Sequence, residues 1–185
     1  LPKALQDYVG METDAEQVST FELELIPGLL QTREYAQAVH LLGARSIAPA
    51  DVERFLSARA KRQERLTSDQ LALHAVVSES ALARVRGAEY AADQYRHLVR
   101  MAARDNITIQ VLPLSAGLHQ SMSGGFALLD FPADTSLPVA YLEYAVGGQL
   151  VDDQSVTERL RSLFEELASA AMDPDASAKY ITEWI

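Results

Sequence analysis

The chain has 185 residues, 48% of them apolar, which is long enough for one sizeable hydrophobic core. With 26 acidic and 16 basic side chains its formal net charge is -10, so the field around it should repel a phosphate backbone. The absence of cysteine excludes disulfides and thiol chemistry, and the four scattered histidines form no zinc-ligand pattern. We therefore expect a single domain that holds no metal and no cofactor.

No apolar run approaches the roughly 20 residues that are needed to cross a bilayer, and the N-terminus lacks the residue order of a signal peptide. We expect a cytoplasmic protein that makes no membrane contact. Because the chain begins with Leu1 rather than methionine, we also expect it to be part of a longer protein.

The first part of the chain, residues 1–70, is predicted to be mainly helical. A loose helical period runs through residues 1–20, and the alternation of apolar and acidic residues over 21–25 is typical of a short half-buried strand. After a Pro-Gly turn, Thr32 has the position of an N-cap for a second helix, and a third helix covers residues 51–66.

The middle part, residues 71–152, is predicted to contain the sheet. An apolar run at 73–77, a helical segment at 90–104 and a β-branched segment at 107–112 follow one another in the chain. Strand, helix and strand in this order favour a right-handed βαβ crossover with the two strands parallel.

Segments 126–131 and 139–144 are joined by turn formers and favour an antiparallel hairpin, to which 149–151 adds a short piece. The layout predicts an α+β fold with a small mixed sheet of three to four main strands. In this sheet the βαβ crossover and the hairpin are packed with N-terminal and C-terminal helices.

The last part, residues 153–185, is predicted to be helical. Its long helix has the clearest period in the chain, with Leu160 and Leu167 on the apolar stripe. Such a stripe packs on the sheet or on another subunit. We expect it to belong to any dimer contact, unless Leu160 and Leu167 are buried within one subunit.

The segment Ile26–Ala36 is the most informative stretch of the chain. Its Pro-Gly pair is a breaker and Thr32 precedes the first periodic apolar residue, Tyr35, so these residues predict a tight loop that leads into a helix. Five further strings follow it in order: Ala58–Arg65, Val77–Leu82, Asn106–Pro113, Gly125–Asp130 and Tyr141–Glu143.

In this order and approximate spacing, the six strings resemble the DUF5753 domain, the region that follows an N-terminal helix-turn-helix in many bacterial XRE-type regulators. The likeness spans nearly the whole chain and includes antitoxin-like regulators. It implies an upstream DNA-binding domain that is absent from this chain, a regulator that works as a homodimer, and often a small protein partner encoded alongside.

The loop around the Pro-Gly turn gives the first group of candidate binding residues. Leu29 and Leu30 need apolar cover, which favours a buried packing element, while the alternative is one wall of a ligand pocket or a partner groove. The candidates from this loop and from the helix behind it are Pro27, Gly28, Leu29, Leu30, Gln31 and Tyr35.

A second group of candidates is charged. Glu143 shares its strand face with Tyr141, so an inward orientation places a carboxylate in apolar surroundings, where it needs a partner. Arg59, on the apolar stripe of its helix, is the candidate cation, and Arg62 is the reserve. We expect a pair Arg59–Glu143 or Arg59–Glu79 that fixes the helix on the sheet; the alternative is the polar floor of a ligand pocket.

The third group surrounds the loop 114–125, which is longer than most connections and rich in small residues, as many binding loops are. His119 is interpreted as an exposed loop histidine, with a ligand contact as the alternative. Two strand aromatics, Phe126 and Tyr141, complete the set of candidates, and for Tyr141 packing in the core or on the sheet is the simpler interpretation.

Catalytic templates are absent from the sequence, which has no Gly-x-Ser-x-Gly elbow, phosphate loop, His-Glu-x-x-His motif or dinucleotide fingerprint. The remaining enzyme hypothesis is a hydrolase-like set of Glu79, His119 and Glu143, which would meet at one end of the sheet as acid and base. It predicts an open cleft in which the three side chains converge within hydrogen-bond reach.

The leading hypothesis is a non-enzymatic domain that senses an effector or a partner for a helix-turn-helix transcriptional regulator, with DNA bound only through the upstream domain. A small-molecule sensor predicts an enclosed, largely apolar pocket of roughly 300 Å³ or more. A module that binds a protein partner predicts an exposed apolar patch or groove, or a two-fold interface of at least about 1,000 Å².

Overall fold

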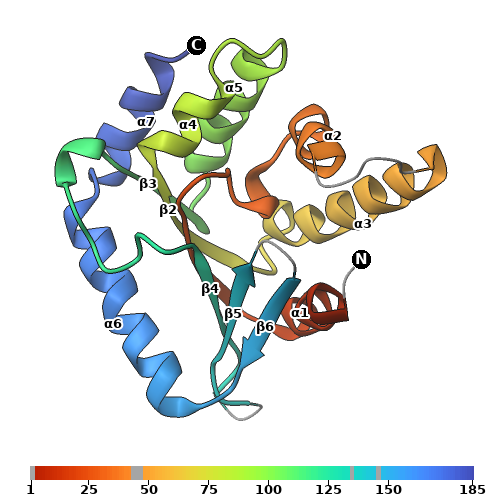
Figure 1. The fold of residues 1–185 in the computed structure, drawn as a ribbon, viewed down its shortest axis with the longest axis vertical. Coiled ribbons are helices and arrows are strands. Elements are labelled where there is room, and N and C mark those ends of the chain that lie inside the picture. Colours follow the sequence, from red (N-terminus) through yellow and green to blue (C-terminus); the bar gives the residue numbers. More distant parts are fainter. Residues whose placement is uncertain (1–2, 43–47, 134–135, 145–146) are drawn as a thin grey trace.

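The computed structural model describes residues 3–42, 48–133, 136–144 and 147–185. These residues form seven α-helices and a six-stranded mixed sheet, which confirms the predicted α+β class (Figure 1). The strands are β1 (Gln17–Glu22), β2 (Ala72–Ser78), β3 (Ile107–Leu112), β4 (Phe126–Asp130), β5 (Val139–Tyr144) and β6 (Gly147–Val151).

The helices surround this sheet and connect its strands. Two of the connections also contain a single turn of 3₁₀ helix, η1 (Gly28–Leu30) and η2 (Leu114–Ala116). The α-helices are α1 (Lys3–Asp14), α2 (Arg33–Leu42), α3 (Pro49–Thr67), α4 (Glu79–Val85), α5 (Ala91–Ala102), α6 (Gln154–Ala170) and α7 (Pro174–Thr182).

The strand order in the sheet is β3-β2-β1-β4-β5-β6. β1, β2 and β3 are parallel, whereas β4, β5 and β6 are each antiparallel to the strands beside them. The parallel pairing of β2 and β3, with α4 and α5 between them in the chain, confirms the predicted βαβ crossover. The pairing of β4 with β5 confirms the predicted hairpin.

The sheet is larger than the expected three to four main strands, and the main difference is β1. This strand lies in the middle of the sheet, although residues 1–20 were expected to be helical and the strand was expected at 21–25. Strands flank β1 on both sides and residues 18–21 are all buried, so most of the strand has no alternation of apolar and polar residues. Because Ser19 and Thr20 are polar, the sequence did not show the continuous apolar run that is typical of a central strand.

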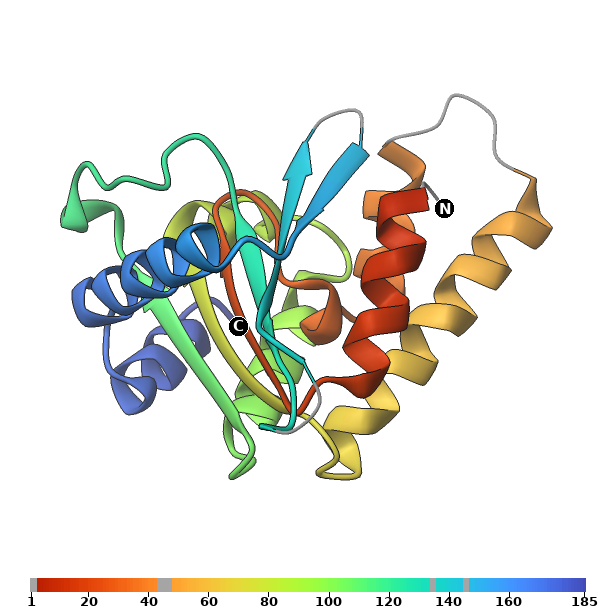
Figure 2. The ribbon, with the colours of Figure 1, turned by 90° about the horizontal axis from the view of Figure 1, so that it is seen from below.

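Helices cover both faces of the sheet, and Figure 2 shows α6 on one side with α1, α2 and α3 on the other. On its own side, α6 packs Phe164 and Leu167 against Phe21 of β1 and other core residues, and Leu160 is partly buried against the same cluster. Fully burying a side chain such as Leu167 contributes roughly 1.5–3 kcal/mol. Leu167 is thus buried against its own sheet, whereas Leu160 is only partly buried, and the expectation that α6 belongs to a dimer contact stays a prediction.

The link between α6 and α7 covers the free edge of β3. Met172 donates its N–H to the carbonyl of Val111 at 2.9 Å, and Val111 donates its own N–H to the hydroxyl of Ser177 at 2.9 Å. Gln110 donates to the carbonyls of Ala168 and Met172 at 3.1 and 2.9 Å. These bonds fix both helices and remove unpaired backbone groups from an edge strand.

The ends of the strands on one side of the sheet form a surface that we call the open edge, in distinction from the outer strands β3 and β6. The carboxyl end of β1 lies beside the start of β4 and the end of β5, as their pairing registers require. The segment 23–32 and the loop 113–125 both join the sheet at this edge (Figure 1). The residues that the sequence marked as candidates therefore gather around it.

Candidate functional site

Two glutamates lie at this edge, one on each side of a glycine. Phe126 of β4 pairs on one side with the residue before Glu22 and on the other with the residue before Glu143. One step further along the strands, Gly125 lies between Glu22 and Glu143. Neighbouring strands are about 4.8 Å apart, so the Cα atoms of the two glutamates are about 10 Å apart and their side chains can face each other. We call Glu22 and Glu143 the acid pair.

Gly125 is required at this position because β1 comes close to it. A Cβ atom added to Gly125 would lie 2.5 Å from the carbonyl oxygen of Phe21 and 3.0 Å from Oε2 of Glu22. Any side chain here would therefore push against the backbone of β1 and displace one carboxylate. The glycine leaves room for the acid pair.

The surroundings of the acid pair favour the protonated form of its carboxyls. Burial and, to a smaller extent, the charge of Glu143 raise the pKa of Glu22 to about 8, against the opposing charge of the Arg59 guanidinium. Burial also raises the pKa of Glu143, again against the effect of Arg59. Among the described residues, none donates a hydrogen bond to either carboxylate, so the pair holds a proton near neutral pH instead of a fixed partner.

Arg59 of α3 is the cation that faces the acid pair, but it forms no ion pair with it. Its Nη1 donates to Oε1 of Gln31 at 2.8 Å, and its guanidinium lies 4.8 Å from the ring centroid of Phe55. A Cβ atom on Gly28 would lie 2.5 Å from Nη1, so this glycine lets η1 approach the guanidinium. Burial lowers the pKa of Arg59 to about 10, and its buried Nε has no hydrogen-bond partner among the described residues.

The expected pair of Arg59 with Glu143 or Glu79 is therefore wrong in its contacts. A buried ion pair that joins α3 to α1 is formed by the reserve candidate, Arg62. Its Nε and Nη2 donate to the two oxygens of Glu12 in α1 at 2.7 and 2.6 Å, and Glu12 is only 2% exposed. This two-bond geometry suits a guanidinium, which matches a carboxylate better than a lysine does.

Tyr141 lies in the core beneath these charges. Its ring stacks on Tyr8 of α1 at a centroid distance of 4.6 Å, and the guanidinium of Arg62 lies 5.6 Å from the Tyr8 ring. Phe126 is also buried, in the cluster beneath α6. Both strand aromatics hold helices on the sheet, which is the simpler of the two interpretations made for Tyr141.

The Pro27–Gln31 segment is fixed mainly by amide side chains. Leu29 and Leu30 are buried, as the packing interpretation requires. Gln31, 5% exposed, donates to the carbonyl of Ile26 at 2.6 Å and accepts from Gln63 on its own carbonyl at 2.8 Å. With Arg59 on its Oε1, Gln31 couples the segment to α3.

The helix start after this segment is formed as predicted. Thr32 accepts a hydrogen bond from the N–H of Tyr35 on its side chain at 3.3 Å, in the geometry of an N-cap. The hydroxyl of Tyr35, which is buried, accepts from the N–H of Ile26 at 3.2 Å. A cavity of about 80 Å³ lies between this segment, α2 and α3; its lining includes Gln31, Arg59 and Gln63.

The three side chains of the enzyme hypothesis have separate surroundings. The oxygens of Glu79 accept from the N–H of Leu114 and from the hydroxyl of Tyr180, each at 2.8 Å. His119 is half-buried and not an exposed loop histidine as expected, because its ring packs edge-on to Phe21 at 5.4 Å between centroids. Among the described residues, no hydrogen bond joins Glu79, His119 and Glu143 to one another.

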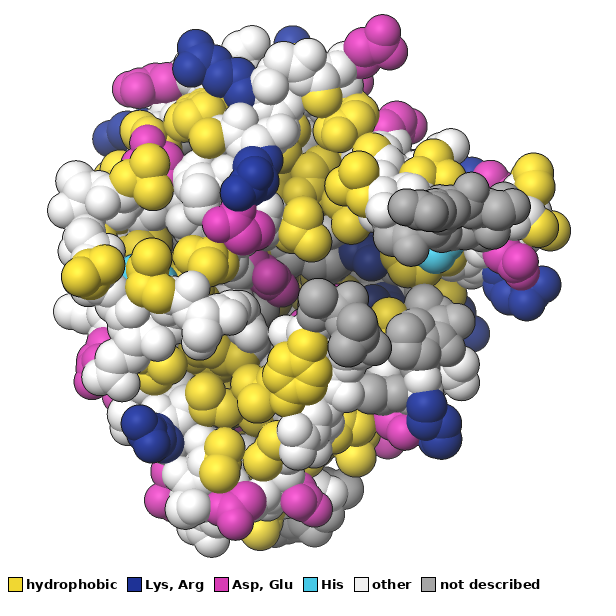
Figure 3. Space-filling model, viewed as in Figure 1, with side chains coloured by type: hydrophobic (Ala, Val, Ile, Leu, Met, Phe, Trp, Pro, Cys, Tyr) yellow, Lys and Arg dark blue, Asp and Glu magenta, His cyan; other side chains and the backbone are white. Residues whose placement is uncertain are grey.

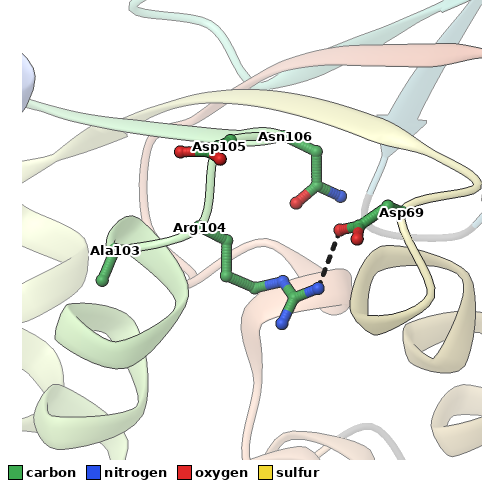
Figure 4. A pocket seen from close by; sticks show the side chains of 5 residues that line it. All are labelled: Asp69, Ala103, Arg104, Asp105 and Asn106. Atoms are coloured by element: carbon green, nitrogen blue, oxygen red, sulfur yellow. Dashed lines mark hydrogen bonds and ion pairs between the residues drawn. The ribbon is translucent and has the colours of Figure 1, made fainter.

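A wider depression lies at the opposite end of the sheet, near the starts of β2 and β3. Figure 4 shows Arg104 reaching Asp69, with Asn106 beside them. Arg104 donates to Asp69 and to the carbonyl of Thr67 at 2.8 Å each, while Asn106 donates to the carbonyls of Leu66 and Leu71. The volume is about 500 Å³, but these side chains hold the turn after α3 in place.

Sequence reasoning missed Glu22, Glu12 and Gln63 as parts of the site. Glu22 was noted only as a polar residue in an alternating segment. Its signal was its place one residue beyond the buried Phe21, where a central strand ends. Gln63 shares the apolar stripe of its helix with Arg59, and two polar residues on one such stripe indicated that both have polar partners.

Among the described residues, no cluster of His, Asp and Glu is arranged to hold a metal ion. Likewise, none of the helices that the structure describes is long and apolar enough to cross a membrane.

The fold and the site define an α+β domain with a six-stranded mixed sheet, at whose open edge charged side chains face one another. Residues 5–183 match the family described as Domain of unknown function (DUF5753), and the chain belongs to that family. The resemblance seen in the six sequence strings is confirmed. No curated protein matches the chain.

Proposed function

We propose that the chain is a non-enzymatic regulatory domain that senses an effector or a protein partner for a helix-turn-helix transcriptional regulator. DNA is then bound by a domain upstream of this chain, and the regulator works in the cytoplasm as a homodimer. The proposal is supported by the six strings that resemble the region after the helix-turn-helix in XRE-type regulators, a resemblance with which membership of the DUF5753 family agrees. The net charge of -10 supports it too, because this chain itself repels nucleic acid.

The acid pair is the observation that carries the proposal. Glu22 and Glu143 share one edge of the sheet with Arg59, and the charged forms of both carboxyls are disfavoured there. Groups that a fold keeps in such unfavourable surroundings cluster at functional sites. A binding partner that supplies hydrogen-bond donors would relieve this strain, so binding at the acid pair can change the state of the whole domain.

A protein partner fits the described surfaces better than a small molecule does. The cavity beside Arg59 has about 80 Å³, room for two or three waters at about 30 Å³ each, against roughly 300 Å³ for a ligand pocket. The depression of about 500 Å³ beside Arg104 is large enough, but it is open and mainly polar, whereas a ligand pocket is enclosed and largely apolar. In contrast, large apolar side chains of the loop 113–125 are exposed. Exposed apolar groups next to a charged site are typical of a surface that binds another protein.

The test uses the regulator in its own host. The double variant Glu22→Gln/Glu143→Gln and the control Glu165→Gln, an exposed residue of α6, are introduced at the gene, and transcripts are counted at matched protein levels. We expect a defined set of transcripts to change in the double variant and none in the control. Identical transcripts in all three strains would refute the regulatory role.

Native mass spectrometry of the wild-type protein purified from the same cells is the second measurement. We expect a bound partner or molecule on the wild type that the double variant has lost. A bare chain in both preparations would contradict the proposed sensing.

A further inference from the structure

The loop 113–125, here called the apolar loop, exposes large apolar side chains. Leu118 is 92% exposed, Leu114 65% and Met122 51%. The loop contains no Asp, Glu, Lys or Arg, so these side chains are not shielded by charges of their own loop. Contiguous exposed apolar groups of this kind mark interaction sites on soluble proteins.

The apolar loop meets the acid pair at the end of β1, from the other face of the sheet. His119, next to Leu118 in the chain, packs edge-on against Phe21, which points to the α6 face, whereas Glu22, the next residue of the strand, points to the opposite face. At the end of the loop, Gly125 lies against Glu22 itself. Figure 3 shows hydrophobic side chains gathered on this side of the molecule and acidic side chains between them and the middle of the same face.

The charges around this surface select for a cation. Glu24 is paired with Arg84, and Arg59 is bonded to Gln31, whereas the acid pair has no hydrogen-bond donor among the described residues. A chain with a net charge of -10 attracts a positively charged partner over a distance and repels phosphate groups and anionic lipid surfaces. Nucleic acid and membranes are therefore poor candidates for this edge.

From this arrangement we infer that the open edge of the sheet binds a basic, amphipathic segment of a partner protein. Apolar side chains of the segment pack on Leu118 and Met122, and a lysine or arginine side chain inserts between Glu22 and Glu143. The inference rests on the proposed function and specifies the partner of that site. A peptide suits it better than a free amine, because the apolar loop and the acid pair together form an open surface and not an enclosed cavity.

Proton release is a specific consequence of this binding. A cation between the carboxylates favours their charged forms, so it displaces the proton that Glu22 holds below its pKa of about 8. The other groups that face Glu22 are Glu143 of β5, Arg59 of α3 and the phenols of Tyr8 and Tyr35, which stay neutral below pH 8 because burial raises the pKa of each. Affinity should rise by up to about tenfold per pH unit towards pH 8.

The test measures fluorescence anisotropy with a fluorescein-labelled peptide of about 14 residues, built from leucine and lysine in amphipathic order. Glu22→Gln/Glu143→Gln and Leu118→Ser/Met122→Ser are the test variants; Glu165→Gln and Leu42→Ser are the controls. Leu42 is 84% exposed at the end of α2, which makes it a matched apolar control. Circular dichroism verifies that every variant is folded.

We expect each double variant to weaken binding about tenfold or more while the controls bind as the wild type does. The affinity of the wild type should rise from pH 6 to pH 8, and that of Glu22→Gln should not. Equal binding by all variants would overturn the inference. It would also be overturned if spermine bound as tightly as the peptide and its affinity were the same for Leu118→Ser/Met122→Ser as for the wild type.

The two proposals fail separately. Changed transcripts in the Glu22→Gln/Glu143→Gln strain together with no peptide binding would overturn this inference and leave the regulatory role in place. Lost peptide binding together with unchanged transcripts would support the binding surface and refute the regulatory role.

Discussion

Replacing Glu22 by glutamine should weaken the decrease in folding stability with rising pH between about pH 5 and pH 8. In the folded protein this carboxyl keeps its proton up to a pKa of about 8, whereas in the unfolded chain it loses the proton near its ordinary value of 4.5. Between these values the folded state binds more protons. The contribution of Glu22 to stability is therefore complete below pH 4.5, falls as the pH rises, and is lost above about pH 8.

The magnitude follows from the two pKa values. Each pH unit within this window changes the free energy of unfolding by about 1.4 kcal/mol, at most about 5 kcal/mol in total. Glu22 is partly exposed, so solvent screening reduces this figure, and we expect a loss of about 2 kcal/mol or more between pH 5 and pH 9.

Urea unfolding followed by the fluorescence of Trp184, the single tryptophan, measures this loss. The wild type, Glu22→Gln and the control Glu165→Gln are compared at about pH 5, 7 and 9. The control should follow the wild type, and Glu22→Gln should show a shallower profile, because Glu143, whose pKa is also raised, still titrates in this variant. Parallel profiles for the wild type and Glu22→Gln would show that Glu22 is not the group that titrates.

Other substitutions test the packing around the site, each by urea unfolding. Arg62→Met leaves a buried carboxylate without its partner and should cost about 3–5 kcal/mol, whereas Arg33→Met, in an exposed pair, should cost about 1 kcal/mol or less; equal losses would contradict the burial argument. Gly125→Ala should cost about 1–3 kcal/mol through its clash with β1, while Gly10→Ala, with open space around it, should be neutral or stabilising. Leu167→Ala should cost about 2–5 kcal/mol and leave the oligomeric state of the folded protein unchanged in sedimentation, since this side chain packs on its own sheet.

The sequence predicted elements whose pattern is local. The crossover from β2 to β3 and the β4–β5 hairpin each combine β-branched or apolar runs with turn formers. The hydrophobic periodicity and the positions of the turn-forming residues therefore suffice to predict them. The cap at Thr32 is local in the same sense, because its hydroxyl needs only the backbone N–H of Tyr35, three residues further along the chain.

What the sequence did not predict depends on contacts between distant segments. β1 gave no alternation because both its faces are covered, and that cover comes from elements elsewhere in the chain. The pair of Arg62 with Glu12 joins positions 50 residues apart, and the sequence of neither helix indicates which of its faces packs against the other helix. The approach of Glu22 to Glu143 needs two strand registers at once, together with a glycine between them. Residue types alone therefore identified candidate charges but not their partners.

Arg59 and Arg62 lie three residues apart on one helix, and they show how a structural group differs from a binding group. Burial lowers the pKa of Arg62, but its hydrogen bonds to Glu12 and the charge of that residue outweigh burial, so the pKa is raised overall. Burial lowers the pKa of Arg59 to about 10, and neither Glu22 nor Glu143 forms an ion pair with it. Arg62 is thus held by its partner, whereas Arg59 acts on the acid pair only through its charge.

The variant Arg59→Met tests this difference between the two arginines. Removing the positive charge that opposes burial should raise the pKa of Glu22 above about 8, because the carboxylate then has less compensation. Carbon-detected NMR titration of labelled glutamate carboxyls measures this pKa directly, with Arg33→Met as a control that should leave it unchanged. A pKa of Glu22 that stays the same or falls in Arg59→Met would mean that Arg59 does not face the acid pair, and the electrostatic basis of the site would be lost.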